Sequence, residues 1–465
     1  MLALRRRDLI LFGVLFLLSL PAVTTRIYAS DEIQLFAWLH SVAFDHDVNF
    51  DDEYRYFYDS GVAHNEDFRE TFLDSEYLNE AGRRQNNATV GSAILWSPFY
   101  AAGHLVAKIS GAPADGYSHP YIAAIAYGSA VYGFLGILLS RAIARQIIGR
   151  GGLPAIVVWA GTPLLFYMYV TPGFSHANEA FIVSLFLWAW LRRRGRWTVG
   201  DALLLGAIGA LMTMVRDQDA LMIAGPAIDF LAHAKRELGR SGARGQAGRL
   251  AASAAAGAAA FIVAYTPQLA AEYLLNGHLG PAAVVKRKLL WWSPNALGVL
   301  VSPHHGLFVW TPLALLCVAG LVWLALGRVK PDCGDCRWVA LLALLMIALQ
   351  AYIAGAFASW TVAGSFGQRR FVGLTPLFTI GLAALYTAPW SRPARATIVT
   401  LTVLAIWWNL GLMALFGTKQ MDRQRVQLAA DIRAVFVTLP HEGPSLIWRY
   451  FTDRSSFYEH PHRVP

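Results

Sequence analysis

Long apolar segments alternate with short polar loops along almost the whole chain. A helix needs about 20 mainly apolar residues to cross the hydrocarbon core of a bilayer. Only helices and closed barrels can satisfy their backbone groups there, and these segments are too long for barrel strands. The pattern predicts an all-α polytopic membrane protein with about 11 transmembrane helices. The predicted spans are residues 9–27, 119–139, 152–170, 176–191, 199–215, 220–232, 250–273, 304–326, 338–357, 371–389 and 396–416.

The positions of basic residues indicate how these spans are oriented. Three arginines, Arg5 to Arg7, precede the first span, and cytoplasmic loops carry an excess of Lys and Arg. The N-terminus is therefore expected in the cytoplasm. If the apolar segment 91–107 crossed the membrane, the three arginines that follow span 119–139 would lie outside. We therefore expect 91–107 to form an interfacial or re-entrant helix.

This topology divides the chain into two parts. Residues 1–416 form a transmembrane module, whose long first outer loop covers residues 28–118. Residues 417–465 form a tail on the extracytoplasmic side. The predicted location is the plasma (inner) membrane, crossed many times, with the polar chemistry of the long loop on its outer face.

Composition changes this picture little. The 465 residues are 56% hydrophobic and 15% charged, whereas soluble domains average about 25% charged residues. The net charge of +9 comes from basic loops between apolar segments, so it reflects topology and indicates no nucleic-acid partner. Cys333 and Cys336 form one CxxC motif without a second pair or nearby histidines, which predicts an ordinary loop and no metal centre.

The first outer loop carries two groups of acids. Asp31 and Glu32 follow directly after the first span, where a helix capped by Ser30 would favour them in its first turn. A second group, residues 45–53, holds five acids, including Asp45 and Asp47. It lacks the glycine of an EF-hand loop. An exposed acidic loop, a site for substrate hydroxyls and a divalent-cation site all remain open for this second group.

Several short motifs resemble one family of membrane enzymes. They are the Asp31-Glu32 pair, the Pro-containing stretch 91–100, and residues 171–179, 302–307 and 365–371. Together they resemble the GT-C glycosyltransferases, including the protein O-mannosyltransferases, the lipid A aminoarabinose transferases and uncharacterised bacterial members. The chain departs from this pattern by lacking a soluble C-terminal domain and by carrying the extra acids at 45–53.

The resemblance implies a reaction and roles for particular residues. It implies transfer of a sugar, with inversion, from a polyprenyl-phosphate donor to a lipid, glycan or protein acceptor at the outer membrane face. The family's catalytic pair falls on Asp31 and Glu32. Whether Asp31, Asp45 or Asp47 is the base stays open; the last two could instead bind substrate. The sequence predicts no resident metal, and a divalent cation at the second group of acids stays an alternative.

A leaving lipid phosphate needs cations or hydrogen-bond donors in a dry site. Arginine suits this role because its guanidinium binds phosphate oxygens in pairs. Interfacial snorkelling toward membrane lipids would explain the same residues without chemistry. Asp217 and Asp219 are expected partners of Arg216, and His176 is expected to bond Glu179. The candidate substrate-binding residues are Arg216, Lys286, Arg287, His304, His305, Gln368, Arg369 and Arg370.

Two other classes of function compete with an enzyme. A membrane transporter or a lipid-linked sugar flippase would carry charges inside its spans and show repeated halves. Here the charges crowd at one face, and the two halves show no evident repeat. A non-catalytic assembly partner is disfavoured because the acids concentrate in one loop beside a helix end.

Overall fold

The computed structural model describes residues 6–74, 78–239, 244–292, 294–329, 334–362 and 364–457. About 75% of the chain is helical, and the described part contains no β-strand. Among the described residues, five helices are long and apolar enough to cross a membrane: α6 (His119–Ile148), α12 (Arg244–Asn276), α17 (Cys336–Ala356), α18 (Thr375–Thr387, with the 3₁₀ turn before it) and α19 (Arg392–Gly417). This arrangement confirms the prediction of an all-α fold and is that of a helical membrane protein.

The remaining helices are shorter. The first loop contains α2 (Ser30–His40), α3 (Asp51–Asp59), α4 (Glu66–Phe68) and α5 (Gly91–Ser110). Shorter helices of the bundle are α1 (Arg6–Ser19), α7 (Gly152–Gly161), α8 (Leu164–Tyr169), α9 (His176–Arg193), α10 (Val199–Val215), α11 (Ala224–Leu238), α15 (Leu307–Trp310) and α16 (Pro312–Ala325). Short connecting and terminal helices are α13 (Ala283–Arg287), α14 (Ala296–Val301), α20 (Leu428–Arg433) and α21 (Leu439–Thr452).

Two predicted spans are interrupted where a proline follows. The segment 152–170 divides into α7 and α8 at Thr162, whose backbone is extended (φ −131°, ψ 164°). The segment 304–326 divides into α15 and α16 at Thr311. Each of these residues precedes a proline, whose ring disfavours the helical conformation in the residue before it. The segment 220–232 also begins in a 3₁₀ turn, η5 (Asp217–Ile223), before α11.

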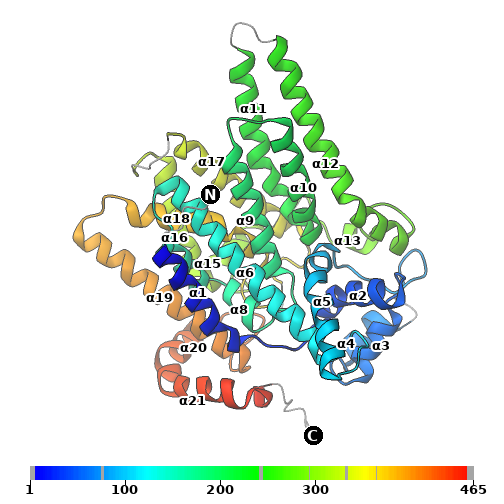
Figure 1. The fold of residues 1–465 in the computed structure, drawn as a ribbon. Helices are drawn as coiled ribbons and strands as arrows, with labels where there is room; N and C mark the ends of the chain where they lie inside the picture. The colour runs from blue at the N-terminus through cyan, green and yellow to red at the C-terminus, as the bar shows by residue number, and fades with distance from the viewer. Residues whose placement is uncertain are drawn as a thin grey trace.

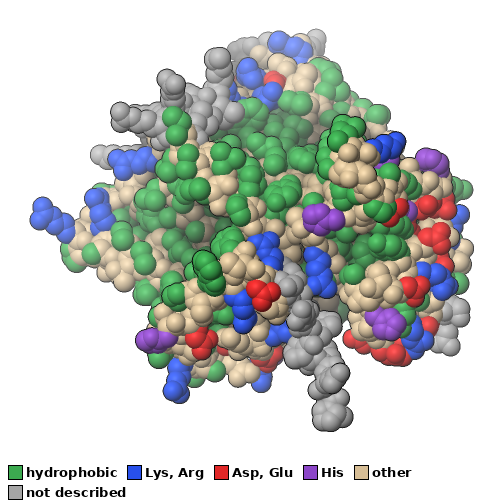
Figure 2. All heavy atoms as spheres, turned by 60° about the horizontal axis from the view of Figure 1, so that its bottom comes forward, with side chains coloured by type: hydrophobic (Ala, Val, Ile, Leu, Met, Phe, Trp, Pro, Cys, Tyr) green, Lys and Arg blue, Asp and Glu red, His purple; other side chains and the backbone are tan. Residues whose placement is uncertain are grey.

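The two ends of the molecule differ in what they carry (Figure 1). Helices α2 to α4 and the tail helices α20 and α21 lie at the lower end of the bundle, and the end of α11 and the start of α12 project from the upper end. Figure 2 brings the lower end forward and shows acidic side chains gathered over the first loop. The exposed acids of that loop include Asp52, Asp59, Glu66, Asp67 and Glu70.

The flank of the bundle is apolar and unburied. Only 6% of the most apolar window of α12 is buried inside the molecule. Leu153 and Val263 are 63% and 69% exposed. Soluble proteins rarely expose large contiguous apolar surfaces to water, whereas a bilayer accommodates them. The exposed apolar flank therefore fits contact with lipid.

Glycines let neighbouring bundle helices approach closely. A Cβ atom added to Gly381 of α18 would lie 2.0 Å from the carbonyl oxygen of Cys317 in α16, and one on Gly320 would lie 1.9 Å from that of Gly381. Small residues at such crossings are typical of packed membrane helices. The crossing of α16 and α18 therefore has no room for a methyl group on either glycine.

We expect Gly381→Ala to lower the free energy of unfolding by about 3 kcal/mol, because overpacking forces the two helices apart. Gly13→Ala in α1 is the matched control, since its added Cβ meets nothing within 4 Å. Thermal unfolding in detergent measures both variants. Equal melting temperatures for the two would contradict the close approach of α16 and α18.

Candidate functional site

Glu32 fixes the start of α2. Its Oε2 accepts the backbone N–H groups of Tyr28 and Ala29 at 3.1 and 3.0 Å. The residue before the helix is Ala29, so the prediction that Ser30 caps it is wrong. The Glu32 side chain is fully buried. A Cβ atom on Gly173 would lie 2.8 Å from its Oε1, so Gly173 leaves the space that Glu32 occupies.

Burial raises the pKa of Glu32 to about 7, against the two backbone donors, which favour its ionised form. Glu32 is therefore largely protonated in the folded protein below pH 7 and ionised in the unfolded chain above its ordinary pKa of 4.5. A raised carboxyl pKa costs stability that grows as pH rises through this window. The full difference corresponds to about 3 kcal/mol.

We expect Glu32→Gln to be increasingly more stable than the wild type as pH rises from 5 to 8. A Gln side chain keeps an oxygen for the two backbone N–H groups and cannot ionise. Thermal unfolding of both proteins across this range measures the difference. A difference that does not change with pH would show that Glu32 stays ionised in the fold.

Asp31 and Arg369 form the central ion pair of the site. Arg369 Nη1 donates to Asp31 Oδ2 at 2.5 Å, across 338 residues of sequence. The Asp31 side chain is 43% exposed and that of Arg369 is 21% exposed. The prediction that an acid after the first helix meets a cation of a distant loop is therefore confirmed for these two residues.

Desolvation raises the pKa of Asp31, but the charge and hydrogen bond of Arg369 outweigh it. The guanidinium groups of Arg216 and Arg370 lower the pKa further, so the carboxyl is held below its ordinary value. Asp31 is therefore a carboxylate at neutral pH. Arg369, from the loop before α18, contacts Asp31 directly, and Arg216 and Arg370 add positive charge to its surroundings.

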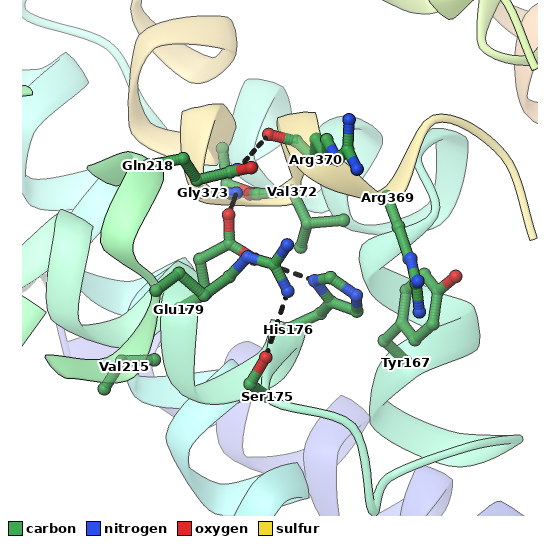
Figure 3. Close-up of polar contacts among 12 residues, drawn as sticks. Tyr167, Ser175, His176, Glu179, Val215, Gln218, Arg369, Arg370, Val372 and Gly373 are labelled. Carbon is green, nitrogen blue, oxygen red and sulfur yellow. Dashed lines mark hydrogen bonds and ion pairs between the residues drawn. The ribbon is translucent and has the colours of Figure 1, made fainter. Parts of the chain in front are cut away.

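Aromatic rings surround the guanidinium of Arg369. Its Cζ lies 5.5 Å from the centroid of Phe174. Figure 3 shows the Arg369 side chain beside the ring of Tyr167, whose hydroxyl donates to the carbonyl of Phe366 at 3.0 Å. The buried Nε of Arg369 has no hydrogen-bond partner among the described residues. The protein encloses this nitrogen, and Arg369 meets Asp31 through its terminal Nη1.

Arg216 binds α9 and not the acids beside it in sequence. Its Nη1 donates to Ser175 Oγ at 3.2 Å, and its Nε lies 3.4 Å from Glu179 Oε2. The expected partners, Asp217 and Asp219, form no ion pair with it in the described structure. The backbone of Arg216 is extended (φ −153°, ψ 121°) between α10 and η5, and its side chain reaches Glu179 of α9.

His176 and Glu179 form the hydrogen bond that their spacing predicts. His176 Nδ1 lies 2.8 Å from Glu179 Oε2, and both side chains are fully buried. The other carboxylate oxygen of Glu179 accepts the N–H of Gly373 at 3.2 Å, as Figure 3 shows. Glu179 thus joins α9, Arg216 and the turn η6 (Arg369–Leu374).

Arg370 points away from Arg369 into a different set of contacts. Its Nη1 donates to the Ala354 carbonyl at 2.8 Å, and its Cζ lies 4.4 Å from the centroid of Phe357. Two amides, Gln218 and Gln350, donate to its backbone carbonyl at 2.9 and 2.6 Å. Arg370 therefore supports the turn that presents Arg369 and acts on Asp31 through its charge.

His305 and Gln368 lie in the interior, and their side chains contact backbone carbonyls. His305 Nε2 lies 2.8 Å from the Ser365 carbonyl, and its ring stacks on Trp310 with centroids 4.5 Å apart. Gln368 Nε2 donates to the carbonyls of His305 and Trp360, each at 3.1 Å. Both residues therefore brace the loop before Arg369.

The other candidates lie outside this cluster. Lys286 and Arg287 are exposed at the end of α13, and His304 is exposed beside His305. Asp45 lies 3.1 Å from His40, and Asp47 accepts the Ser41 hydroxyl at 2.9 Å. None of these forms an ion pair with Asp31 or Arg369 in the described structure. Cys333 lies outside the described residues.

Sequence reasoning did not assign roles to several residues of the cluster: Tyr167, Phe174, Ser175, Gln218, Gln350 and Gly373. Phe174 and Ser175 lie in the motif 171–179, which was singled out as a segment without roles for these side chains. Phe174 packs under Arg369, and Ser175 binds Arg216. Gln350 carries no signal, because it lies within an apolar helix far from any motif.

The sequence matches no model of a known protein family, and a search of curated proteins returns no match. A partly exposed carboxylate can orient and deprotonate a hydroxyl. A guanidinium beside it can bind a phosphate.

Proposed function

We propose that the protein is a GT-C-like glycosyltransferase of about 11 membrane spans. It would move a sugar from a polyprenyl-phosphate donor to a lipid, glycan or protein acceptor on the extracytoplasmic face, with inversion. The observation that supports this most is the Asp31–Arg369 ion pair, in which a carboxylate lies beside a guanidinium, a group suited to phosphate. The predicted outer segments, α2 to α4 and α20 to α21, lie at the same end of the molecule (Figure 1).

In the proposed reaction the acceptor hydroxyl attacks the anomeric carbon, and the bond from that carbon to the phosphate oxygen breaks. The hydroxyl proton goes to the Asp31 carboxylate, and the electron pair goes to the leaving lipid phosphate. A carboxylate with a lowered pKa is a weak base, so proton transfer comes late and positioning contributes most. Arg369 stabilises the charge that develops on the phosphate.

The ion pair implies an order of binding. Asp31 and Arg369 neutralise each other when no substrate is bound. A lipid phosphate that binds Arg369 competes with Asp31 for the guanidinium and frees the carboxylate for the acceptor hydroxyl. Donor binding before acceptor binding follows from this exchange. Arg216, held by Ser175 and Glu179, adds positive charge beside the same carboxylate.

Mass spectrometry of cell-envelope glycans and lipids, with and without the protein, tests this proposal. The expected result is loss of one glycosylated species and accumulation of a polyprenyl-phosphate sugar. Unchanged glycans with the lipid-linked sugar redistributed between leaflets would favour a flippase. Unchanged glycans and unchanged lipids would refute both.

A further inference from the structure

A second polar cluster lies at the opposite end of α2. His40 Nδ1 lies 3.1 Å from Asp45 Oδ2 and 3.1 Å from Glu53 Oε1. The three side chains come from α2, the π-turn η2 (Ser41–Asp45) and α3. Nine residues of helix separate His40 from Asp31, which corresponds to about 14 Å. The cluster is therefore distinct from the Asp31–Arg369 site.

The protons available to His40 do not satisfy this cluster. His40 Nε2 lies 3.1 Å from the Asp115 carbonyl oxygen, which can only accept a hydrogen bond. Nε2 must therefore carry the hydrogen and donate it. In a neutral imidazole, Nδ1 then presents a lone pair to two carboxylate oxygens. Either a second proton or a cation has to lie between them.

Burial makes the missing positive charge between His40 and the two carboxylates costly. Glu53 is fully buried, and His40 is 4% exposed. The second carboxylate oxygen of Glu53, Oε2, has no hydrogen-bond partner among the described residues. An unpaired carboxylate in such surroundings is unfavourable unless a cation neutralises it. The orphaned oxygen is an observation independent of the His40 geometry, and it also indicates a missing positive partner.

We propose that His40, Asp45 and Glu53 bind a divalent transition-metal ion of the zinc class. The three ligand atoms lie within 4.8 Å of one another. Two ligands about 2.0–2.1 Å from a tetrahedral zinc stand about 3.3 Å apart, close to the 3.1 Å between Nδ1 and each carboxylate oxygen. Mixed imidazole and carboxylate ligands suit zinc better than calcium or magnesium.

The surroundings of His40 match those of a metal ligand. A metal-bound histidine usually donates its other ring N–H to a carbonyl or carboxylate, which fixes the ring orientation. Asp115 supplies that carbonyl, and Tyr117 stacks on the ring with centroids 3.8 Å apart. The Asp45 side chain is 32% exposed, which leaves a side of the site open to water as a fourth ligand.

A metal here would join α2, α3 and the loop before α6. Asp45 and Glu53 hold it from η2 and α3, and the Asp115 carbonyl holds His40 from the loop. The ion would clamp the C-terminal end of the helix whose first turn carries Asp31. The proposal stands without the glycosyltransferase assignment, because it rests on other residues.

Metal content and thermal unfolding of the full-length protein in detergent test the site. After treatment with EDTA, the wild type is expected to bind one Zn²⁺ per chain and to melt at a higher temperature when Zn²⁺ is added. Glu53→Gln and Asp45→Asn should each weaken Zn²⁺ binding at least tenfold. Because Asp45 is partly exposed, Asp45→Asn should keep the fold. It therefore tests the site even if Glu53→Gln fails to fold. Co²⁺ in place of Zn²⁺ reports tetrahedral coordination by its visible absorption.

Asp47→Asn is the matched control, because Asp47 lies in the same loop but bonds Ser41 and Asn49. It should bind Zn²⁺ as the wild type does. Absence of stoichiometric Zn²⁺ in the wild type would overturn the proposal and leave His40 as a doubly protonated ring between two carboxylates. Equal Zn²⁺ binding by the wild type and by Asp45→Asn would also overturn it, as adventitious binding.

Discussion

Asp31→Asn should reduce sugar transfer by about 10²- to 10⁴-fold, the usual contribution of a positioned general base. The amide has nearly the shape of the carboxylate but cannot take the acceptor proton. Because Asp31 is 43% exposed and Arg369 is 21% exposed, water can solvate Arg369 once its partner is neutral, so the variant should fold and express normally. Recovery of the missing glycan in cells that lack the wild-type protein measures the effect.

Two variants in the second group of acids serve as controls for this experiment. Asp45→Asn and Asp47→Asn remove carboxylates that lie outside the Asp31 cluster. Neither should lower transfer as far as Asp31→Asn does. Full transfer by Asp31→Asn would reject Asp31 as the base, and loss of transfer in Asp47→Asn with normal expression would move the role to the second acidic group.

Arg369→Ala should weaken binding of the lipid phosphate about 10- to 100-fold, because a hydrogen bond to a charged group contributes about 1.5–3 kcal/mol. Polyprenyl phosphate without a sugar is a suitable probe, since every donor of this class releases it. Binding to the protein in lipid nanodiscs gives the affinity. Arg287→Ala is the control, because Arg287 is an exposed cation outside the cluster. Equal affinities for both variants would refute phosphate binding by Arg369.

The same variant should change the pH dependence of transfer. Asp31 acts as a carboxylate, so transfer falls as pH falls through its pKa. Desolvation raises the pKa of Asp31, and Arg369 is the largest opposing influence. Without Arg369 that pKa rises, and the acidic limb of the rate profile should move to higher pH. An unmoved acidic limb would show that Asp31 is not the group that titrates.

Local sequence pattern accounts for the positions of the helices. The predicted span 199–215 coincides with α10 (Val199–Val215), and 176–191 falls within α9 (His176–Arg193). Apolar runs locate helices because a bilayer requires internally bonded backbone. The helix breaks at Thr162 and Thr311 are caused by the prolines that follow them. The length of an apolar segment does not predict such breaks.

Partner choice was harder to predict than helix position. Proximity in sequence favoured Asp217 and Asp219 for Arg216, whereas the fold places Arg216 against Glu179 and Ser175. Glu53 belongs to the second group of acids, but its pairing with His40 gave no signal, because that pairing depends on how α3 folds back against α2. Side-chain partners follow from which helices pack together, and apolar patterns carry little information about that.

The sequence alone determined that this is a helical protein built from apolar segments, and it placed Asp31 and Glu32 directly after the first of them. Only the tertiary structure brought Arg369 to Asp31 across 338 residues and buried Glu32 while leaving Asp31 partly exposed. Helix formation depends on neighbours within a few turns and on the surrounding solvent. An ion pair between distant loops depends on the packing of every helix between them.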